Sequence, residues 1–211
     1  DVEMLMDWLK KGDPESGRKG MAPISVNTHI RMLRQIFGQA QLWHYVIENP
    51  FKQAKLLKFQ QKEPRALTRQ EIKIILQYAA KRYPKYVDVF RFYLVTGMRL
   101  SEALELRWEN VRWEERLITL NKTKTKTNRR IPLLPVTQDL LKRRLALGES
   151  RPFPFAVRRV QFVFARICKA TGIRGVSIQN LRASVYSYMV DLGVPQQLVR
   201  KIIGHTSDAI G

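Results

Sequence analysis

Apolar residues recur every three or four positions through most of this 211-residue chain, a spacing typical of amphipathic helices. The first clear case runs from Ser25, a candidate N-cap, to Leu42. Its apolar face consists of Val26, Ile30, Leu33, Phe37 and Ala40. Polar side chains, among them Asn27, Arg31 and Arg34, lie on another face. The pattern therefore predicts a helix that buries one side, and Asn49-Pro50 ends this part of the chain.

Residues 51–65 are interpreted as a basic linker, which forms a loop or a solvated helix and which Pro64 closes. Lysines recur through the segment, at Lys52, Lys55 and Lys58 among other positions. Such a segment either exposes its charges to solvent or lies along a phosphate backbone, and the sequence alone favours neither. We therefore expect two domains, over residues 1–62 and 65–211, with the basic linker at the end of the first.

The second unit begins with a capping box, Thr68-Arg69-Gln70-Glu71, followed by an apolar stripe. A short helix is expected after Gly97, where Arg99 lies. Further helices are predicted over residues 85–96, 137–147, 157–170, 179–192 and 195–203. Residues 117–120 and 129–133 are predicted to form two short strands joined by a polar loop. The sequence thus predicts a mainly α fold with a small β-sheet or hairpin.

The net charge of the chain indicates what kind of partner the protein binds. Thirty-eight Lys and Arg against eighteen Asp and Glu give a formal net charge of +20. A folded protein this basic repels itself unless an anion relieves the repulsion, and nucleic acid is favoured over an anionic membrane. The apolar runs are too short for a membrane span, and the single cysteine, Cys168, excludes an internal disulfide. We expect a cytoplasmic protein without a membrane partner.

Three groups of residues suggest chemistry. Arg99 lies at the predicted start of a helix, where the helix dipole disfavours positive charge. The loop NKTKTKTNRRIPL, residues 121–133, carries five basic residues and no acid. Arg182 lies near another helix start, and His205 directly follows the glycine that ends the last predicted helix. Each group alone is usually a solvated surface feature, but their order in so basic a chain is not easily coincidental.

The motifs TGMRLSEALELRW, TKT…RRIPL, NLR and IIGHTS together resemble the tyrosine recombinase family, also called phage-type integrases. In the N-terminal part, SVNTHIRMLRQIFGQA…ENPF looks like the core-binding domain of that family. The resemblance implies a helical core-binding domain over residues 1–62 that is incomplete at its N-terminus, since the family usually has a further helix before Asp1. It also implies a catalytic domain over residues 65–211. The two domains would form a C-shaped clamp around DNA.

The resemblance also implies roles for individual residues. Arg99 and Arg182 would bind the scissile phosphate, and Lys124 would protonate the leaving 5′ oxygen. His205 would form a hydrogen bond to the phosphate, and Gln179 takes the position of a histidine common in the family. The expected DNA-binding residues are Asn27, Arg31, Arg34, Lys52, Lys55, Lys58, Lys122, Lys126, Arg129 and Arg130. Lys122 and Lys126 are close enough to Lys124 that either could take its role. No metal and no cofactor are implied.

Two departures from the family pattern qualify this prediction. Glutamine at Gln179 cannot take up a proton at neutral pH, so general-base help from this position would be lost. The family's nucleophilic tyrosine follows the GH motif, yet none of the residues after His205 is a tyrosine. We expect that residue beyond Gly211. Tyr186 and Tyr188 precede His205 and are interpreted as packing or DNA-facing residues.

The predicted function is therefore site-specific DNA recombination through a 3′-phosphotyrosyl intermediate. The protein would act on double-stranded DNA with a specific target site, as a tetramer on DNA and as a weak oligomer or monomer without it. Two alternatives remain open at this point. One is a catalytically impaired DNA-binding protein on the same scaffold, which Gln179 and the missing tyrosine favour. The other is an activity like that of type IB topoisomerases.

Overall fold

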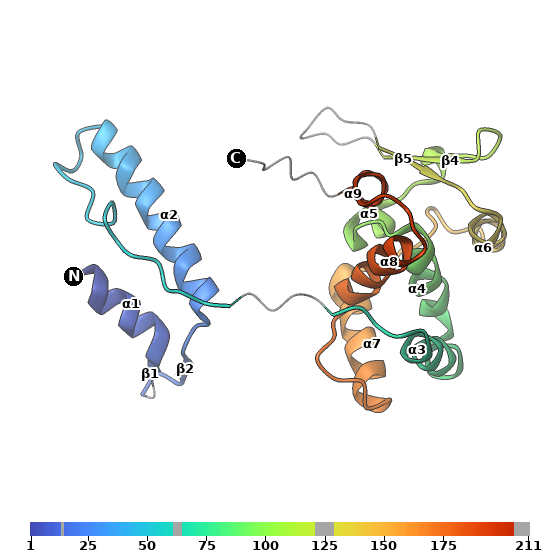
Figure 1. Ribbon diagram of the computed structural model, residues 1–211, viewed down its shortest axis with the longest axis horizontal. Coiled ribbons are helices and arrows are strands. Elements are labelled where there is room, and N and C mark those ends of the chain that lie inside the picture. The colour runs from blue at the N-terminus through green and yellow to red at the C-terminus, as the bar shows by residue number, and fades with distance from the viewer. Residues whose placement is uncertain (14, 61–64, 121–128, 205–211) are drawn as a thin grey trace. The chain divides into compact units, whose positions relative to one another are not determined.

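The computed structural model describes residues 1–13, 15–60, 65–120 and 129–204 (Figure 1). The chain divides into two compact units, Asp1–Glu63 and Pro64–Gly211. Each unit has its own hydrophobic core.

The first unit is built on two helices, α1 (Val2–Lys11) and α2 (Pro23–Leu42). A short antiparallel hairpin of β1 (Gly12–Asp13) and β2 (Arg18–Lys19) joins them. The predicted apolar stripe of α2 is confirmed, since Val26 and Ile30 are fully buried with Met6 and Leu9 of α1. The hairpin was not predicted, because strands of two residues carry no readable period.

The prediction that Ser25 is the N-cap of α2 is wrong. The helix begins two residues earlier, and the cap position belongs to Ala22. Pro23 occupies the first turn, where its missing N–H costs nothing and its fixed φ favours the helix. The backbone oxygen of Ser25 instead lies 2.8 Å from Nδ1 of His29 inside the helix.

The segment 51–57 is a strap packed on the first unit, so its interpretation as a linker was wrong. Phe51 is only 6% exposed and lies in the core, against Phe37. Arg34 donates to the backbone oxygens of Phe51 and Ala54, at 2.9 and 2.7 Å. Asn27 is buried and pairs with Leu57, donating to its oxygen at 2.9 Å and accepting from its N–H at 2.8 Å. Asn27 and Arg34 therefore hold the strap. The prediction that Asn27 contacts DNA is wrong because its side chain is buried, whereas Arg34 is half-buried and its contact with DNA stays a prediction.

Replacing Asn27 by alanine should destabilise the first unit by about 2 kcal/mol, since it leaves the N–H and C=O of Leu57 without these partners. Amide exchange at Leu57 and at the core residue Ile30 should rise together. Gln35→Ala on the exposed side of α2 is the matched control. Equal effects of the two substitutions would show that the strap is held by burial of Phe51 alone.

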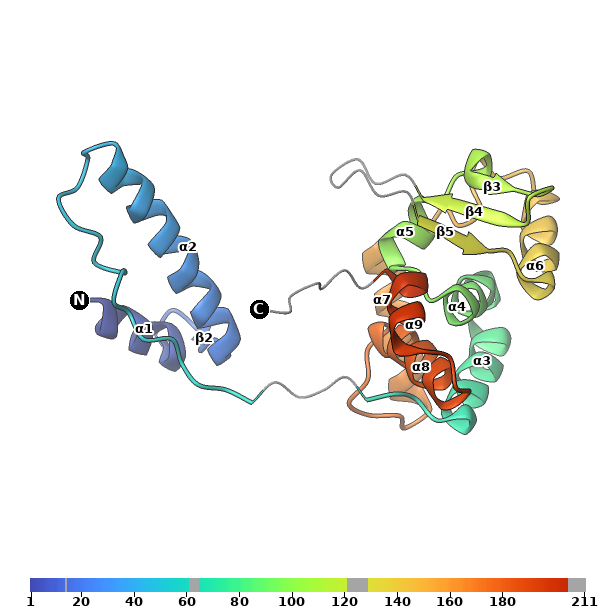
Figure 2. The same ribbon diagram turned by 45° about the horizontal axis from the view of Figure 1, so that its top comes forward.

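The second unit contains most of the predicted helices, and Figures 1 and 2 show their arrangement. Its helices are α3 (Arg69–Arg82), α4 (Pro84–Thr96), α5 (Leu100–Glu105), α6 (Pro135–Leu145), α7 (Val157–Ala170), α8 (Gln179–Asp191) and α9 (Gln196–Ile203). A 3₁₀ turn, Trp108–Asn110, follows α5. The sequence placed the bounds of these α-helices within a few residues, because their caps and apolar stripes are local signals.

The sheet of the second unit has three antiparallel strands in the order β3 (Val111–Arg112), β4 (Leu117–Leu120) and β5 (Arg129–Pro132). Ile118 pairs with Ile131, and both are buried. Leu120 pairs with Arg129 at the other end of the ladder. The two predicted strands are confirmed, and β3 was missed.

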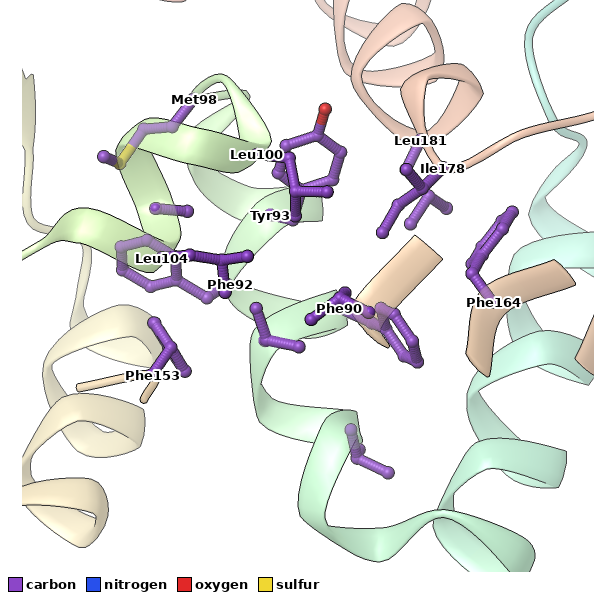
Figure 3. Close-up of a cluster of buried hydrophobic side chains, with 14 of the residues drawn as sticks. Phe90, Phe92, Tyr93, Met98, Leu100, Leu104, Phe153, Phe164, Ile178 and Leu181 are labelled. Carbon is purple, nitrogen blue, oxygen red and sulfur yellow. The ribbon is translucent and has the colours of Figure 1, made fainter. Parts of the chain in front are cut away.

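Helix α4 lies at the centre of the second unit, as Figure 3 shows for the residues around it. Phe90, Phe92 and Tyr93 are at most 1% exposed, so α4 is buried on more than one side. Phe90 meets Phe164 of α7 edge-on at 5.8 Å between ring centroids, and Phe92 lies 4.9 Å from Phe153. These ring contacts hold α4 in place, and with it the turn at its C-terminal end.

The first residues of the second unit are bound to α8. Asn180 Nδ2 donates to the oxygen of Arg65 at 2.8 Å, and the N–H of Leu67 donates to Ser184 Oγ at 2.7 Å. The hydroxyl of Tyr188 donates to the oxygen of Leu67 at 2.5 Å. Tyr188 is therefore a packing residue, one of the two roles expected for it.

An ion pair at this junction makes the stability of the second unit depend on pH. Arg65 donates to both carboxylate oxygens of Glu71, at 2.8 and 2.7 Å, and the N–H of Thr68 donates to the same group. The hydrogen bond from Arg65 is the main cause that lowers the pKa of Glu71 from 4.5 to about 2. The predicted capping box is also confirmed, since Thr68 accepts from the N–H of Glu71.

Because the pKa of Glu71 is lower in the folded state, the unfolded state binds more protons in this range. The stabilisation is complete above about pH 4.5 and is lost as the pH falls towards about 2. We expect the free energy of unfolding, measured by denaturant at pH 6 and pH 3, to fall less in Glu71→Gln than in the parent. Glu114→Gln, at an exposed carboxylate, should keep the parental pH dependence.

Candidate active site

A tight turn between α4 and α5 creates the first part of the site. Gly97 ends α4 in the left-handed conformation with φ 59°, as its sequence position predicted. A β-carbon at Gly97 would lie 2.9 Å from Ile203 Cγ2 and 3.2 Å from Val185 Cγ1. The turn therefore packs directly on α8 and α9, and Arg99 follows it as the N-cap of α5.

Glu102 explains how an arginine is tolerated at this helix start. The carboxylate accepts from the N–H of Arg99 at 2.9 Å and from Arg99 Nη1 at 2.9 Å. The remaining amino group, Arg99 Nη2, donates to the oxygen of Gly204 at 2.7 Å. The Arg99 side chain is still 39% exposed. It is thus held in place while part of it stays open to a ligand.

Arg182 reaches the same turn from α8. Its Nη1 donates to the oxygen of Gly97 at 2.9 Å, and the side chain is half-buried. Burial, with the positive charges of Arg99 and Arg129 adding to it, lowers the pKa of Arg182 to about 10. Arg182 therefore stays charged at neutral pH but lacks a full set of counter-ions, and an anion bound there would stabilise it.

Arg129 also belongs to this cluster. Its Nη2 donates to Glu102 at 2.6 Å, and its Nη1 donates to the oxygen of Ile203 at 2.8 Å. Its side chain is only 13% exposed. Both Nη groups of Arg129 are bound within the protein and little of the side chain is exposed, which disfavours the predicted contact of this side chain with DNA.

Glu102 was not predicted as a site residue. Its signal was the spacing in Arg99-Leu-Ser-Glu102, which places the carboxylate one helical turn after the arginine. Burial alone would raise the pKa of Glu102, but hydrogen bonds from Arg99 and the charge of Arg129 together lower it. Glu102 is therefore an anion that orients two arginines.

The other predicted site residues are either exposed or outside the described part of the chain. Gln179 is exposed at the start of α8, one turn before Arg182, and Arg130 is exposed on β5. The predicted DNA-binding residues of the first unit that are exposed are Arg31, Lys52, Lys55 and Lys58. Outside the described residues lie Lys122, Lys124, Lys126 and His205.

This arrangement offers an anion two part-exposed guanidinium groups, those of Arg99 and Arg182. Arg99 and Arg129 share the carboxylate of Glu102, Arg182 is bound to the oxygen of Gly97, and guanidinium donors match phosphate oxygens in a planar fork. Within the described ranges no group of three or more His, Cys, Asp or Glu side chains could hold a metal ion. None of the described helices is long and apolar enough to cross a membrane.

A family model described as the phage integrase family matches residues 65–210. The chain belongs to the phage integrase family. This confirms the family predicted from the sequence motifs and supports a role in site-specific DNA recombination.

Proteins similar to this chain are named as tyrosine recombinases or integrases. A tyrosine recombinase of Thermosipho africanus is 22% identical over 98% of this chain and 76% of its own length. The integrase of Haemophilus phage HP1 is 27% identical over 87% of this chain and 53% of its own length.

Solved integrase structures share the fold. A lambda integrase tetramer bound to a Holliday junction matches with a TM-score of 0.79 at 18% identity, covering all of this chain and 64% of that one. The Tn1549 transposon integrase with circular intermediate DNA matches with a TM-score of 0.76 at 19% identity, covering 99% of this chain and 78% of that one. The predicted fold class, mainly α with a small sheet and a catalytic domain of the tyrosine recombinase type, is confirmed.

Proposed function

We propose that this protein is a site-specific recombinase that cuts and rejoins DNA through a 3′-phosphotyrosyl intermediate. One observation carries the proposal. Arg99 and Arg182, which come from different helices, are both bound at the turn that Gly97 forms, where each keeps a charged group available to an anion. Membership of the phage integrase family supports the assignment of that anion as the scissile phosphate.

In the proposed reaction a tyrosine oxygen attacks phosphorus, and the bond from phosphorus to the 5′ oxygen breaks. Negative charge builds on the non-bridging oxygens, where Arg99 and Arg182 would stabilise it. Lys124 would donate its proton to the leaving 5′ oxygen, and His205 would form a hydrogen bond to the phosphate. Gln179 would donate a hydrogen bond without taking up a proton.

The attacking tyrosine is not among the residues that follow His205 in this chain. The hydroxyl of Tyr188 is bound to the backbone of Leu67, and Tyr93 is 1% exposed, so neither is available. The complete reading frame decides whether a tyrosine follows Gly211.

We propose double-stranded DNA with a specific target site as the partner. The Tn1549 integrase structure is a complex with circular intermediate DNA, and the lambda integrase structure is a tetramer bound to a Holliday junction. The net charge of +20 fits such a polyanion, and exposed Lys52, Lys55, Lys58 and Arg130 are candidate phosphate contacts. Both units would contact the duplex, and four copies would assemble on the recombining sites.

The test is to capture covalent adducts. The protein is expressed from its complete reading frame in cells that carry its native flanking DNA. It is then denatured and purified, and any DNA that remains attached to it is sequenced. Adducts at one shared sequence are the expected result. Adducts without a shared sequence would favour the topoisomerase reading. DNA binding without adducts would favour the DNA-binding protein that Gln179 suggests.

A further inference from the structure

Arg129 and Arg130 are adjacent on β5 but have opposite environments. Arg130 is exposed, whereas the Arg129 side chain is only 13% exposed. The strand alternates its side chains, so one arginine faces solvent and the other faces α5 and α9. Figure 2 shows β5 beside both helices. The sequence alone gave the two arginines the same role.

Arg129 joins parts of the site that are far apart in sequence. It donates to Glu102, which in turn holds Arg99, and it donates to the oxygen of Ile203 at the end of α9. The backbone oxygens at a helix C-terminus lack helical partners and lie at the negative end of the dipole. Arg129 and Arg99 donate to the successive oxygens of Ile203 and Gly204, so both guanidinium groups cap α9.

Gly204 is the residue that allows this close contact. It ends α9 in the left-handed conformation with φ 76°, and a β-carbon at this position would overlap with Nη1 of Arg129. A side chain at Gly204 would therefore displace the guanidinium. The glycine before His205 is needed for Arg129 as well as for the turn.

A buried arginine without a use is costly, because the desolvation of a charge is compensated only by good partners. Arg129 even leaves its Nε buried without a hydrogen bond within the described part of the chain. It also adds positive charge next to Arg99 and Arg182, which disfavours the empty site. The enclosed position of Arg129 is therefore explained by its bonds to Glu102 and to the oxygen of Ile203.

We propose that Arg129 is a positioning residue, which acts through Glu102 and the oxygen of Ile203 to fix Arg99 and the end of α9 in one arrangement. The inference rests on the proposed function, because it takes Arg99 to bind the scissile phosphate. It adds Arg129 to the residues that form the site. Arg129 itself does not touch the phosphate in this arrangement.

The first test needs no recombinase chemistry. Hydrogen exchange in the protein without DNA should show the Gly204 amide, which donates to Arg200, exchanging about tenfold faster in Arg129→Gln. Arg112→Gln, at an exposed arginine on β3 of the same sheet, is the matched control and should not change this rate. Unchanged exchange in Arg129→Gln would overturn the proposal whether or not the protein is a recombinase.

The second test uses the target duplex recovered from the captured adducts. Arg129→Gln should lower the single-turnover cleavage rate at saturating DNA about a hundredfold. Its Kd for the duplex should change by less than about threefold, since the buried side chain makes no phosphate contact. A weaker Kd with a normal saturated rate would make Arg129 a DNA contact and overturn the proposal. If the parent forms no adduct, the proposed function fails while the exchange result still stands.

Two further variants separate positioning from folding. Arg129→Lys keeps the charge opposite Glu102 but cannot donate in a fork to both partners, so it should recover only part of the rate. Arg129→Gln and Glu102→Gln should be non-additive when combined, because they disrupt the same contact. Additive losses, or no recovery in a well-folded Arg129→Lys protein, would contradict action through Glu102.

Discussion

Arg182→Ala is expected to reduce covalent adduct formation about a thousandfold, while most of the DNA affinity remains. The substitution removes a charged donor from the place where negative charge would develop during attack on phosphorus. The half-buried guanidinium is bound to the oxygen of Gly97, so it is already oriented before DNA arrives. The many basic residues elsewhere in the chain would continue to bind the phosphate backbone.

The measurement compares adduct yield and Kd on the same duplex. Arg174→Ala, at an exposed arginine of the same unit, is the matched control and should retain both. Arg182→Lys distinguishes charge from geometry, since a lysine keeps the charge without the planar fork. A fully active Arg182→Ala protein would show that the phosphate does not bind at this turn.

Phe90→Ala is expected to destabilise the second unit by about 3–5 kcal/mol. Phe90 is completely buried on α4 and packs edge-on against Phe164 (Figure 3). Its removal leaves a cavity beside the helix whose end forms the Gly97 turn. Arg99 and Arg182 should lose their fixed geometry as the temperature approaches the lowered midpoint.

Urea unfolding followed by circular dichroism measures this loss. Because the chain has two units, the transition must be assigned by probes in each and cannot be treated as a single two-state step. Phe162→Ala removes a ring that is 50% exposed on α7, and it should cost far less. Similar losses for the two substitutions would mean that the α4–α7 contact does not stabilise the unit.

Features that depend on residues close together in the sequence were predicted from the sequence. The capping box at Thr68 and the glycine stops at Gly97 and Gly204 are local choices of backbone conformation, and the structure has each of them. Helix α7 matches its predicted bounds, because its apolar stripe repeats regularly along the chain. The four motifs likewise identified the family, since order and residue type are properties of the sequence.

Contacts between distant residues were decided only by the tertiary structure. The helical pattern placed Asn27 on the polar face of its helix and so predicted that it is exposed. In the structure the strap covers Asn27 through Leu57, which is 30 residues later in the sequence. Arg129 and Arg130 are indistinguishable by residue type, and only the register of β5 with β4 turns one inward. The bonds from Arg129 to Ile203, from Arg182 to Gly97 and from Arg99 to Gly204 span 74, 85 and 105 residues.

The sequence by itself thus determined which helices form in the second unit, about where they end and which family the chain belongs to. These properties depend on local backbone preference, apolar periodicity and motif order. The tertiary structure decided which charged groups meet, because a hydrogen bond depends on packing that brings remote segments within about 3 Å. Glu102 between Arg99 and Arg129 is the clearest case, since its partners are set by how α5, β5 and α9 pack together.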